Sequence, residues 1–499
     1  MSKFNETKTI KTENICGNAA YPMTPKDRLV CSCLTSMFGE PKFYGNNDSL
    51  IVTDAVYMAK HDPDFLAKLC VYARNEGNMR SVSHVLACVI AKYAHEYTRR
   101  VIRKIIVRAD DITEILACYI AMYGKPIPNA LKRELGEQVK KFNAYGIAKY
   151  SGGKKAVKFK DVLRICHPKP DTDEQRELFG CIINDTLPIP YTWETELSEK
   201  GNTKEVWDAL IASNKLGYMA MLRNLRNMHR AGVDIKPVLD MLAEPEAAKN
   251  SRQLPFRYFS AYRELHNMEG IDGYLLDYAA QKLNAALTVN VDTLPTLKGR
   301  TLIAVDMSGS MSATVSDKSK VTCCDIARLL GALAAHICED ADVCYFSAGW
   351  NWYRYDTYGM DGAYCVRRYG KSDNILESAL AKLPVYSGGT DMHIPMQYAL
   401  NMDRGLKPYD RVIYFSDNEC NSSWDGLNKT VQSEIDKYRN EKNPDLWVHG
   451  VDLQGYGTQQ FIGKRFNLIA GWGDTVLQFI DLAEKGIDTL TKHIEGVEV

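Results

Sequence analysis

The sequence predicts a chain of two parts: a helical half that runs to about residue 295, and an α/β half with a parallel sheet that follows it. Before residue 295, apolar side chains recur at three- and four-residue spacing, which is the pattern of amphipathic helices. After it, short apolar runs alternate with helical patterns, as in parallel sheets that helices cover on both faces. The length of 499 residues also exceeds what a single hydrophobic core usually serves.

The helical half consists of short segments separated by residues that favour turns. Helical spacing is clearest at Leu66–Arg74, Ser81–Ala94, Thr98–Arg108 and Lys204–Ile211, and breaks such as Gly124–Pro126 stand between segments. The pattern contains no strands. Because a pair of short helices cannot bury its own apolar face, we expect these helices to stack as structural repeats, although no strict sequence period is present.

The second half begins after Pro295–Gly299, which we interpret as a hinge, so the sequence predicts one domain at residues 1–295 and another at 296–499. Ligands of parallel sheets gather at the carboxyl ends of the strands, which makes the residues after each strand candidates for a site. The predicted strands are Thr301–Asp306, Asp342–Phe346, Arg411–Ser416, Leu446–Leu453 and Phe466–Ala470. The predicted helices are Cys323–Ile337, Asp373–Lys382, Asp391–Asn401, Lys429–Arg439 and Thr475–His493.

The bulk composition is that of an ordinary globular protein. Hydrophobic residues make up 45% and charged residues 25% of the chain, and the formal net charge is zero. We find neither a secretory signal nor a run of about 20 apolar residues, so we expect a cytoplasmic protein without a membrane segment. The 14 cysteines form no CxxC pair, which favours reduced and mostly buried thiols over disulfides or zinc sites.

The sharpest motif is VDMSGSMS, Val305 to Ser312, which directly follows a predicted strand. Asp306, Ser308 and Ser310 alternate in it, so a loop that curls around an ion can point all three side chains inward. Gly309 allows the tight turn between the serines. One carboxylate and two hydroxyls are hard oxygen donors, which suit Mg²⁺ or Mn²⁺ and suit zinc or copper poorly.

Two further elements stand where such a metal site needs them. Thr390 follows two glycines before a predicted helix and can add a hydroxyl, while Asp417 follows the strand RVIYFS and can add a second carboxylate, directly or through water. Together with Asp306, Ser308 and Ser310 they predict a divalent-cation site, and the alternative is a degenerate motif that binds no metal. A site of this kind leaves one position open for the carboxylate of a partner. Nothing in it resembles a hydrolytic apparatus.

Positive charge is concentrated in the helical half despite the neutral total. Twelve lysines and arginines stand between Lys125 and Lys169, opposed only by Glu134, Glu137 and Asp161. The glycine-containing loop YSGGKKAVKFK can follow a phosphate backbone, and its alternative is an ordinary solvated loop. The RNA-contact candidates in this region are Lys149, Lys154, Lys155, Lys158, Arg164 and His167, although a lone histidine before a proline more often caps its helix.

Two more basic stripes occupy predicted helices. Arg223, Arg226 and Arg230 share one helix face through spacings of three and four, and Arg100, Lys104 and Arg108 form a similar series. Either stripe could bind RNA, remain solvated or pair with acidic neighbours. Tyrosines that could stack on bases are Tyr145, Tyr150, Tyr218, Tyr258 and Tyr262, although packing roles suit most of them.

Taken together, the motifs resemble known families. The DxSxS loop, GGT loop and strand-end aspartate resemble the metal-ion-dependent adhesion site of von Willebrand A domains. The helical half resembles the TROVE module of the Ro ribonucleoprotein family, and the order of the two parts matches too. The resemblance covers nearly the whole chain and runs through RLVCSCLTSMFGEPKFY, YARNEGNMRSVSHVLA, IPNALKRELGEQVKKFNAYGIAKY, VLRICHPKP, LPIPYTWE, MLRNLRNMHRAGV and LPFRYFSAYREL, then VDMSGSM, GGTDM and FSDNE.

The resemblance implies a ring of HEAT-like helical repeats closed by a Rossmann-like A domain. In that family single-stranded ends of misfolded RNAs thread the ring, and small noncoding Y RNAs bind its basic outer surface. It implies that Lys149 and His167, which fall in the family's KY and HPKP strings, contact RNA. The family often has arginines directly after KY, whereas Ser151–Gly153 intervene here before Lys154. Lysines keep the charge but lose arginine's bidentate grip on phosphate, so the chain departs from the family at this Y-RNA contact.

We therefore expect a monomeric, non-enzymatic RNA scaffold or chaperone in RNA quality control, which presents defective RNAs to an exoribonuclease. The alternative is a metal-dependent protein-interaction module that captures an acidic residue of a partner. A metal-dependent nuclease is the least favoured reading, because two-metal phosphodiester chemistry clusters several carboxylates, and this site offers two.

Overall fold

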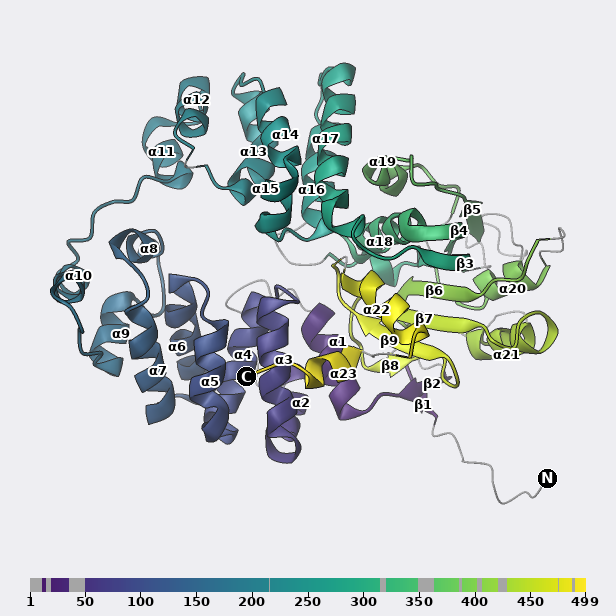
Figure 1. Ribbon diagram of the computed structural model, residues 1–499, viewed down its shortest axis with the longest axis horizontal. Helices are drawn as coiled ribbons and strands as arrows, with labels where there is room; N and C mark the ends of the chain where they lie inside the picture. The colour runs from purple at the N-terminus through teal and green to yellow at the C-terminus, as the bar shows by residue number, and fades with distance from the viewer. Residues whose placement is uncertain are drawn as a thin grey trace. The chain divides into compact units, whose positions relative to one another are not determined.

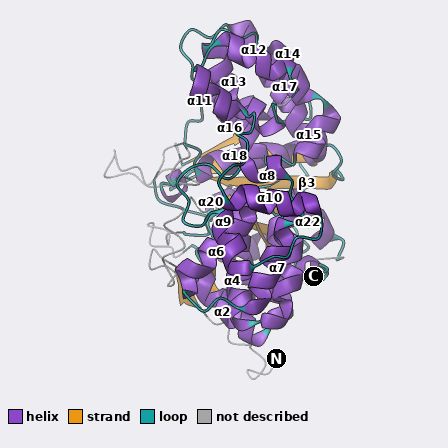
Figure 2. Ribbon diagram, turned by 90° about the vertical axis from the view of Figure 1, so that its left-hand side faces the viewer, coloured by secondary structure: helices purple, strands orange, loops and turns teal. Residues whose placement is uncertain are grey.

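The computed structural model describes residues 11–14, 19–35, 50–214, 216–314, 320–348, 363–385, 388–401, 406–420, 429–473, 475–486 and 490–499. Contacts divide the chain into two compact units. The first holds Met1–Thr35, Met221–His229 and Asp234–Leu490, and the second holds Ser36–Ala220, Arg230–Val233 and Thr491–Val499. Helices dominate up to Val291 and an α/β sheet begins at Leu297 (Figures 1 and 2), so the predicted combination of a helical part and an α/β part is confirmed.

The second unit is built from short helices packed on one another. α4 contacts α2, α3 and α6, while α7 contacts α5 and α9, so each helix buries its apolar face against neighbours along the chain. Several helices begin at a side-chain cap, as where the Asp62 carboxylate accepts the Phe65 N–H at 3.2 Å. The helices are α2 (Leu50–His61), α3 (Pro63–Asn75), α4 (Arg80–Tyr93), α5 (Thr98–Ile105), α6 (Ala109–Tyr123), α7 (Asn129–Val139), α8 (Ala144–Ala148), α9 (Phe159–Cys166), α10 (Asp173–Ile183), α11 (Trp193–Lys200), α12 (Lys204–Ala212) and α23 (Leu490–Glu495).

A buried carboxylate joins three of these helices. Asp111 of α6 accepts hydrogen bonds from Arg74 of α3 at 3.0 Å and from Arg80 and His84 of α4 at 2.6 and 3.1 Å. Burial alone would raise the pKa of this carboxyl, but the His84 hydrogen bond and the charges of Arg80 and Arg74 hold it well below its usual range. The string YARNEGNMRSVSH therefore serves packing in the second unit.

The helices of the first unit pack next to its sheet domain. α17 contacts α14, α15 and α16, and α16 in turn contacts α18 of the sheet domain. An ion pair between Arg263 and Asp325 and a hydrogen bond from the Ile375 N–H to Asn284 at 2.9 Å fix this contact. These helices are α1 (Pro25–Thr35), α13 (Tyr218–Arg230), α14 (Lys236–Ala243), α15 (Pro245–Ser251), α16 (Pro255–His266) and α17 (Gly273–Val291).

The sheet has six strands in the order β5-β4-β3-β6-β7-β9, parallel except for β5. Chain order reverses between the central strands β3 and β6, which is where parallel sheets of this type bind ligands. The strands are β3 (Leu297–Asp306), β4 (Cys338–Phe346), β5 (Tyr364–Arg367), β6 (Arg411–Ser416), β7 (Trp447–Asp452) and β9 (Phe466–Ala470). The helices are α18 (Cys323–Ile337), α19 (Ile375–Leu380), α20 (Ile394–Asn401), α21 (Val431–Glu441) and α22 (Thr475–Glu484).

Several local predictions were wrong. Leu297–Gly299, interpreted as part of a hinge, is the start of β3. The single helix predicted over Thr475–His493 is α22 followed by α23. The helical half also contains strands: β1 (Thr12–Glu13) pairs with β2 (Ala19–Pro22), which pairs with β8 (Thr458–Gln459) of the sheet domain. These strands are two to four residues long, too short to show an alternating pattern.

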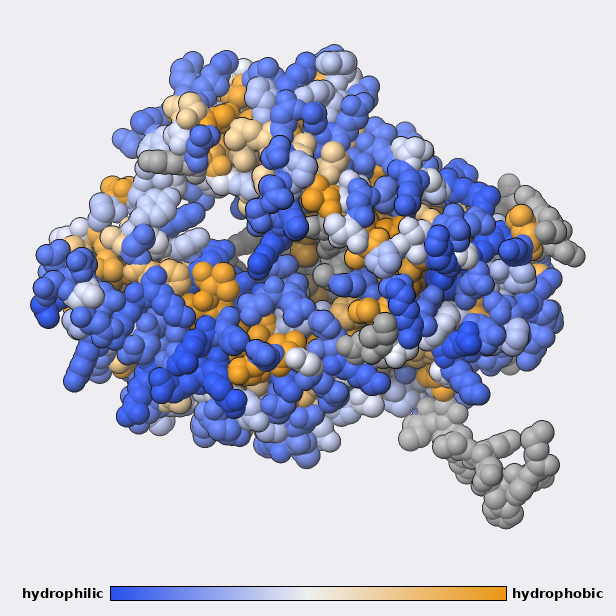
Figure 3. Space-filling view, in the orientation of Figure 1, coloured by the Kyte–Doolittle hydropathy of each residue, from blue (hydrophilic) through white to orange (hydrophobic). Residues whose placement is uncertain are grey.

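The surface and the cysteines agree with the composition. Hydrophilic residues cover most of the face seen in Figure 3, and the apolar ones are scattered over it in small groups. No helix within the described ranges is long and apolar enough to cross a membrane. The cysteines of the described residues form no disulfides, and most are buried.

Candidate functional site

The predicted metal loop lies at the carboxyl end of the central strand β3. Asp306 ends that strand and is fully buried. Its carboxylate accepts the Ser308 N–H at 2.8 Å and the Ser416 hydroxyl, from the end of β6, at 2.6 Å. The first carboxylate of the motif is thus fixed between the two strands where chain order reverses.

The two predicted hydroxyl-bearing loops contact each other. The Ser308 and Ser310 hydroxyl oxygens lie 3.1 Å apart, and the Gly309 N–H donates to the Gly388 carbonyl at 2.7 Å. A Cβ atom at Gly309 would stand 3.3 Å from that carbonyl, so the close approach favours glycine. Thr390, two residues beyond Gly388, is buried. The structure therefore brings the serine loop and the threonine loop to one place.

Asp417 follows β6 and is also fully buried. One of its carboxylate oxygens accepts the Glu419 N–H at 3.1 Å, and the other, Oδ2, has no hydrogen-bond partner within the described residues. Burial raises the pKa of Asp417, and hydrogen bonds from Ser310 and from backbone amides lower it only in part. Burial and then the charge of Asp417 raise the pKa of Asp306 to about 7.

These features fit a divalent cation. Two buried carboxylates stand close enough to repel each other, and neither forms an ion pair with a lysine or arginine of the described residues. An ion beside the Asp417 Oδ2 atom would supply the missing partner and balance both charges. The donors are carboxylate and hydroxyl oxygens, the set that Mg²⁺ and Mn²⁺ accept.

A third buried carboxylate, Asp452, was not predicted. It ends β7, and its Oδ1 accepts the N–H groups of Gln454 and Gly455 at 2.9 and 2.8 Å. Burial, and with it the charge of Asp417, raises its pKa to about 7. The Gln454 amide donates to the Ser310 carbonyl at 3.2 Å, which ties this loop to the metal loop. Its position at a strand end could have identified it, because Asp452 is the last residue of β7 as Asp306 is of β3. The predicted strand, however, ran on to Leu453.

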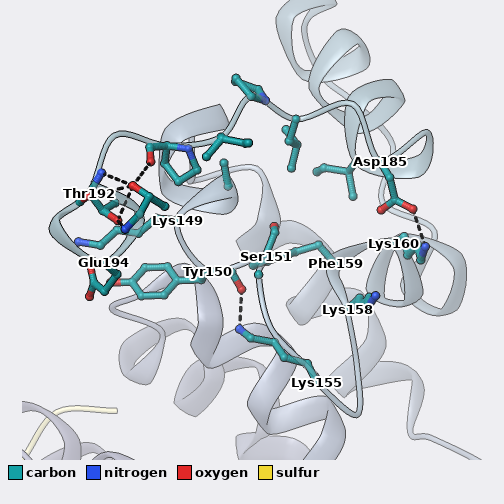
Figure 4. A pocket seen from close by; sticks show the side chains of 18 residues that line it. Lys149, Tyr150, Ser151, Lys155, Lys158, Phe159, Lys160, Asp185, Thr192 and Glu194 are labelled. Atoms are coloured by element: carbon teal, nitrogen blue, oxygen red, sulfur yellow. Dashed lines mark hydrogen bonds and ion pairs between the residues drawn. The ribbon is translucent and has the colours of Figure 1, made fainter. Parts of the chain in front are cut away.

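The basic loop between α8 and α9 forms one wall of a cavity of about 610 Å³ (Figure 4). Of the predicted residues, Lys149, Lys155 and Lys158 line it, and the exposed Lys154 does not. The Lys155 ammonium group donates to the Tyr150 carbonyl and so fixes the loop. The remaining wall comes from the LPIPYTWE string and the end of α10: Ile182, Asp185, Leu187, Pro188, Ile189, Pro190, Thr192, Glu194 and Thr195.

Arg164 and His167 lie next along the chain and are exposed. His167 ends α9 in the left-handed conformation, with φ of 50°, and its N–H donates to the Leu163 carbonyl at 3.0 Å. The residue therefore terminates its helix through its backbone, as the structural alternative supposed, while its imidazole stays accessible. Neither side chain lines the cavity.

Of the three α13 arginines, two are exposed and one forms an ion pair. Arg223 and Arg230 are exposed, whereas Arg226 forms an ion pair with Glu264 of α16. Arg257 of α16 was not predicted. Burial, and then the charge of Arg223, lowers its pKa, so the two guanidinium groups lie near each other. Arg223 and Arg257 therefore form a positive cluster between α13 and α16.

The positive charge of the Arg100, Lys104 and Arg108 stripe is partly neutralised. Arg108 makes a bidentate pair with Asp110, at 3.0 and 2.9 Å, and its guanidinium lies 4.7 Å from the centre of the Tyr150 ring. Arg100 lies over the Tyr97 ring at 4.9 Å. Of the tyrosines considered for stacking, Tyr258 and Tyr262 are buried, Tyr218 and Tyr150 are half-buried and Tyr145 is exposed.

Comparisons with known proteins agree with this architecture. A model of the TROVE domain matches residues 15–186 and 183–272, and a model of the Ro60 vWA domain matches residues 300–451. The crystal structure of the Ro (RSR) protein of Deinococcus radiodurans matches with a TM-score of 0.58 and 17% identity, over 92% of this chain and 100% of that one. At 17% identity, this match shows a shared fold.

Curated relatives are also similar over part of their length. Telomerase protein component 1 of Rattus norvegicus is 24% identical over 330 residues, and that of Mus musculus is 22% identical over 329 residues. Each match covers 48% of this chain but only 12% of the relative. The chain thus spans about an eighth of the length of these curated relatives.

Proposed function

Because this chain belongs to the TROVE-domain family of RNA-binding Ro ribonucleoproteins and carries a von Willebrand A domain, we propose that it binds Y-type noncoding RNAs and single-stranded ends of misfolded RNAs. In this role it would act as a non-enzymatic scaffold in RNA quality control. The observation that carries the proposal is the group of exposed basic residues at Lys149, Lys154, Lys158, Arg164 and His167, which share one stretch of the second unit. Arg223 with Arg257 and Arg230 supply positive charge in α13 and α16.

Binding would be largely electrostatic. Lysines and arginines that neutralise phosphates release counterions, so affinity falls steeply as salt is added, with a slope of about −0.7 per contact for single strands. The net charge of the whole chain is zero, so this attraction depends on the local groups. We expect variants that remove charge there to lose affinity, and equal changes elsewhere to lose little.

The direct test is filter binding of a structured RNA with and without a single-stranded 3′ tail. Wild type should bind the tailed RNA more tightly, and Lys149→Gln/Lys158→Gln, His167→Ser and Arg223→Glu should each reduce that affinity. The matched control is Lys437→Gln, which removes an exposed charge from α21 of the A domain. Failure of both RNAs to bind at physiological salt would refute the proposal.

The A domain supports a second role. We propose that Asp306, Ser308, Ser310, Thr390 and Asp417 hold Mg²⁺ or Mn²⁺, and that the ion's open position takes a carboxylate of a protein partner such as an exoribonuclease. The Oδ2 atom of the buried Asp417, which has no hydrogen-bond partner in the part of the chain that the structure describes, favours this assignment. Chelation should then abolish partner binding and leave RNA binding intact. RNA should also stay intact during incubation with either ion, because the proposed scaffold is non-enzymatic; cleavage would argue for a nuclease.

A further inference from the structure

The cavity between the α8–α9 loop and the LPIPYTWE segment has walls of two kinds. Figure 4 shows Lys149, Tyr150 and Glu194 on one side and Lys158 with Phe159 across from them. Apolar groups, including the exposed Ile189 and its flanking prolines, close another part of the wall. A volume of about 610 Å³ lies within the range that protein sites use for small molecules. Such a cavity can accommodate one flat, partly apolar group that carries a phosphate.

The charges at the cavity favour an anion. Lys160 pairs with Asp185 at 2.6 Å, so these two charges largely cancel. Lys155 donates to the Tyr150 carbonyl, which is a neutral acceptor. Lys149 and Lys158 are exposed, and each can turn its ammonium group toward a phosphate. Glu194 is the one remaining carboxylate among the lining residues, where it can accept hydrogen bonds from an amino group of a base.

Tyr150 supplies an aromatic surface that is already held in place. Its ring is half-buried, and the Arg108 guanidinium and the Lys149 ammonium lie 4.7 and 5.6 Å from its centre. Arg108 is itself held by its bidentate pair with Asp110. A base that stacks on a restrained ring loses less conformational entropy than one that must order a mobile side chain.

The segment that carries Thr192, which lies beside Lys149 in Figure 4, is also preformed. The Thr192 side chain accepts the Thr195 N–H at 3.2 Å, the Thr195 side chain accepts the Thr192 N–H at 3.0 Å, and the Thr195 hydroxyl donates to the Pro190 carbonyl at 3.0 Å. Ser151 donates to the Ile147 carbonyl at 2.8 Å and restrains the α8–α9 loop. Both lining segments are therefore fixed by bonds within themselves.

We propose that this cavity is a nucleotide pocket that takes one unpaired nucleotide of a bound RNA, with its base beside Tyr150 and the apolar wall and its phosphate at Lys149 and Lys158. The inference rests on the proposed RNA binding and adds to it a subsite that distinguishes an unpaired nucleotide from a duplex. A free nucleotide shares this chemistry but lacks the flanking phosphates that neighbouring cations such as Lys154 and Arg164 would engage.

The test compares three RNA hairpins that differ at one internal position: fully paired, with a single unpaired nucleotide, and with an abasic unit in place of that nucleotide. Wild type should bind the unpaired form about five- to tenfold more tightly than either of the others, which is the gain expected of one stacked base. Tyr150→Ala should remove the gain, and the exposed control Tyr145→Ala, outside the cavity, should keep it.

A second variant guards against misfolding. Ile189 is 86% exposed, so Ile189→Asp should fold normally, and it should still remove the preference by placing negative charge in the wall. If wild type binds RNA but shows no preference, or if both variants retain it, the pocket assignment is wrong while the proposed function stands. Loss of all RNA binding by wild type would instead refute the proposed function. Displacement of RNA by micromolar nucleoside monophosphate would overturn the assignment to RNA.

Discussion

At the scale of residues, the surroundings of a buried aspartate decide its role. Asp111 is surrounded by Arg74, Arg80 and His84, and it stays ionised as a structural anchor. Asp306 and Asp417 receive only hydroxyl and N–H donors from the described residues, and burial raises the pKa of both. The first carboxylate is paired by neighbouring side chains, whereas the second pair fits the divalent cation that we propose.

Asp111→Asn should destabilise the protein by about 3–5 kcal/mol, because it removes the buried carboxylate that pairs with the half-buried Arg74 and Arg80 and with the buried His84. Urea unfolding measures this effect. The control is Asp173→Asn on α10, whose side chain is 83% exposed and which should change stability by less than about 0.5 kcal/mol. Equal, small effects of the two substitutions would mean that the Asp111 network contributes little.

Asp417→Asn should stabilise the metal-free protein, whereas Asp111→Asn should destabilise it. Without metal it removes one of two repelling buried charges, so the melting temperature should rise. The same change should abolish the further increase that Mg²⁺ or Mn²⁺ gives wild type by binding the folded state. Thermal melts with and without the ion measure both effects. A variant that melts lower without metal yet still responds to it would exclude Asp417 as a ligand.

At the scale of elements, close packing fixes the strand that carries the metal loop. A Cβ atom added to Gly331 of α18 would stand 2.7 Å from a methyl group of Val305 in β3, one residue before Asp306. The absence of a side chain at Gly331 thus lets α18 pack directly against β3. Glu484 of α22 makes a second link, since it accepts hydrogen bonds from Arg411 of β6 at 2.6 and 2.8 Å and from His449 of β7 at 3.0 Å.

Gly331→Ala should cost about 1–3 kcal/mol, because the methyl group forces α18 away from β3. Its control is Gly180→Ala in the middle of α10, where an added Cβ meets nothing within 4 Å. That control should be neutral or gain up to about 1 kcal/mol from helix propensity. If Gly331→Ala were as well tolerated as the control, the packing of α18 on β3 would be looser than described.

The Glu484 cluster predicts a pH dependence. Burial alone would raise the pKa of Glu484, but hydrogen bonds from His449 and Arg411 outweigh it and lower the pKa to about 2, below the ordinary 4.5. Its contribution is therefore complete above pH 4.5 and is lost as the pH falls toward 2, for a total of about 3 kcal/mol. Acid unfolding of Glu484→Gln should be less steep than that of wild type in this window, and parallel curves would contradict the shift.

The sequence predicted the long elements and missed the short ones. β3, β4, β6, β7 and β9 were each anticipated because buried parallel strands are continuous apolar runs. β1, β2, β5 and β8 have two to four residues, and each depends on pairing with another strand, which so short a run of residues does not record. The candidate metal residues stood out in the sequence because Asp306 and Asp417 lie at strand ends and Thr390 precedes a helix. The Asp111 network and the α8–α10 cavity depend on side chains that only tertiary contacts bring together.

At the scale of the whole molecule, a neutral chain concentrates positive charge where RNA is proposed to bind. The basic residues between Lys125 and Lys169 are balanced by acidic residues elsewhere, such as those of the A domain. Attraction for RNA then comes from particular lysines and arginines. The affinity for RNA should fall far more when these lysines and arginines are removed than when an equal charge is removed elsewhere on the chain.

The measurement that tests this claim most directly is the salt dependence of binding to a 3′-tailed RNA, compared for wild type, Lys149→Gln/Lys158→Gln and a variant that loses two charges in the A domain, Lys437→Gln/Lys442→Gln. We expect the logarithm of the affinity to fall linearly with the logarithm of salt, and the Lys149/Lys158 variant to flatten that slope by about 1.5. The A-domain variant should keep the wild-type slope. Equal slopes for all three proteins would contradict RNA binding at this surface.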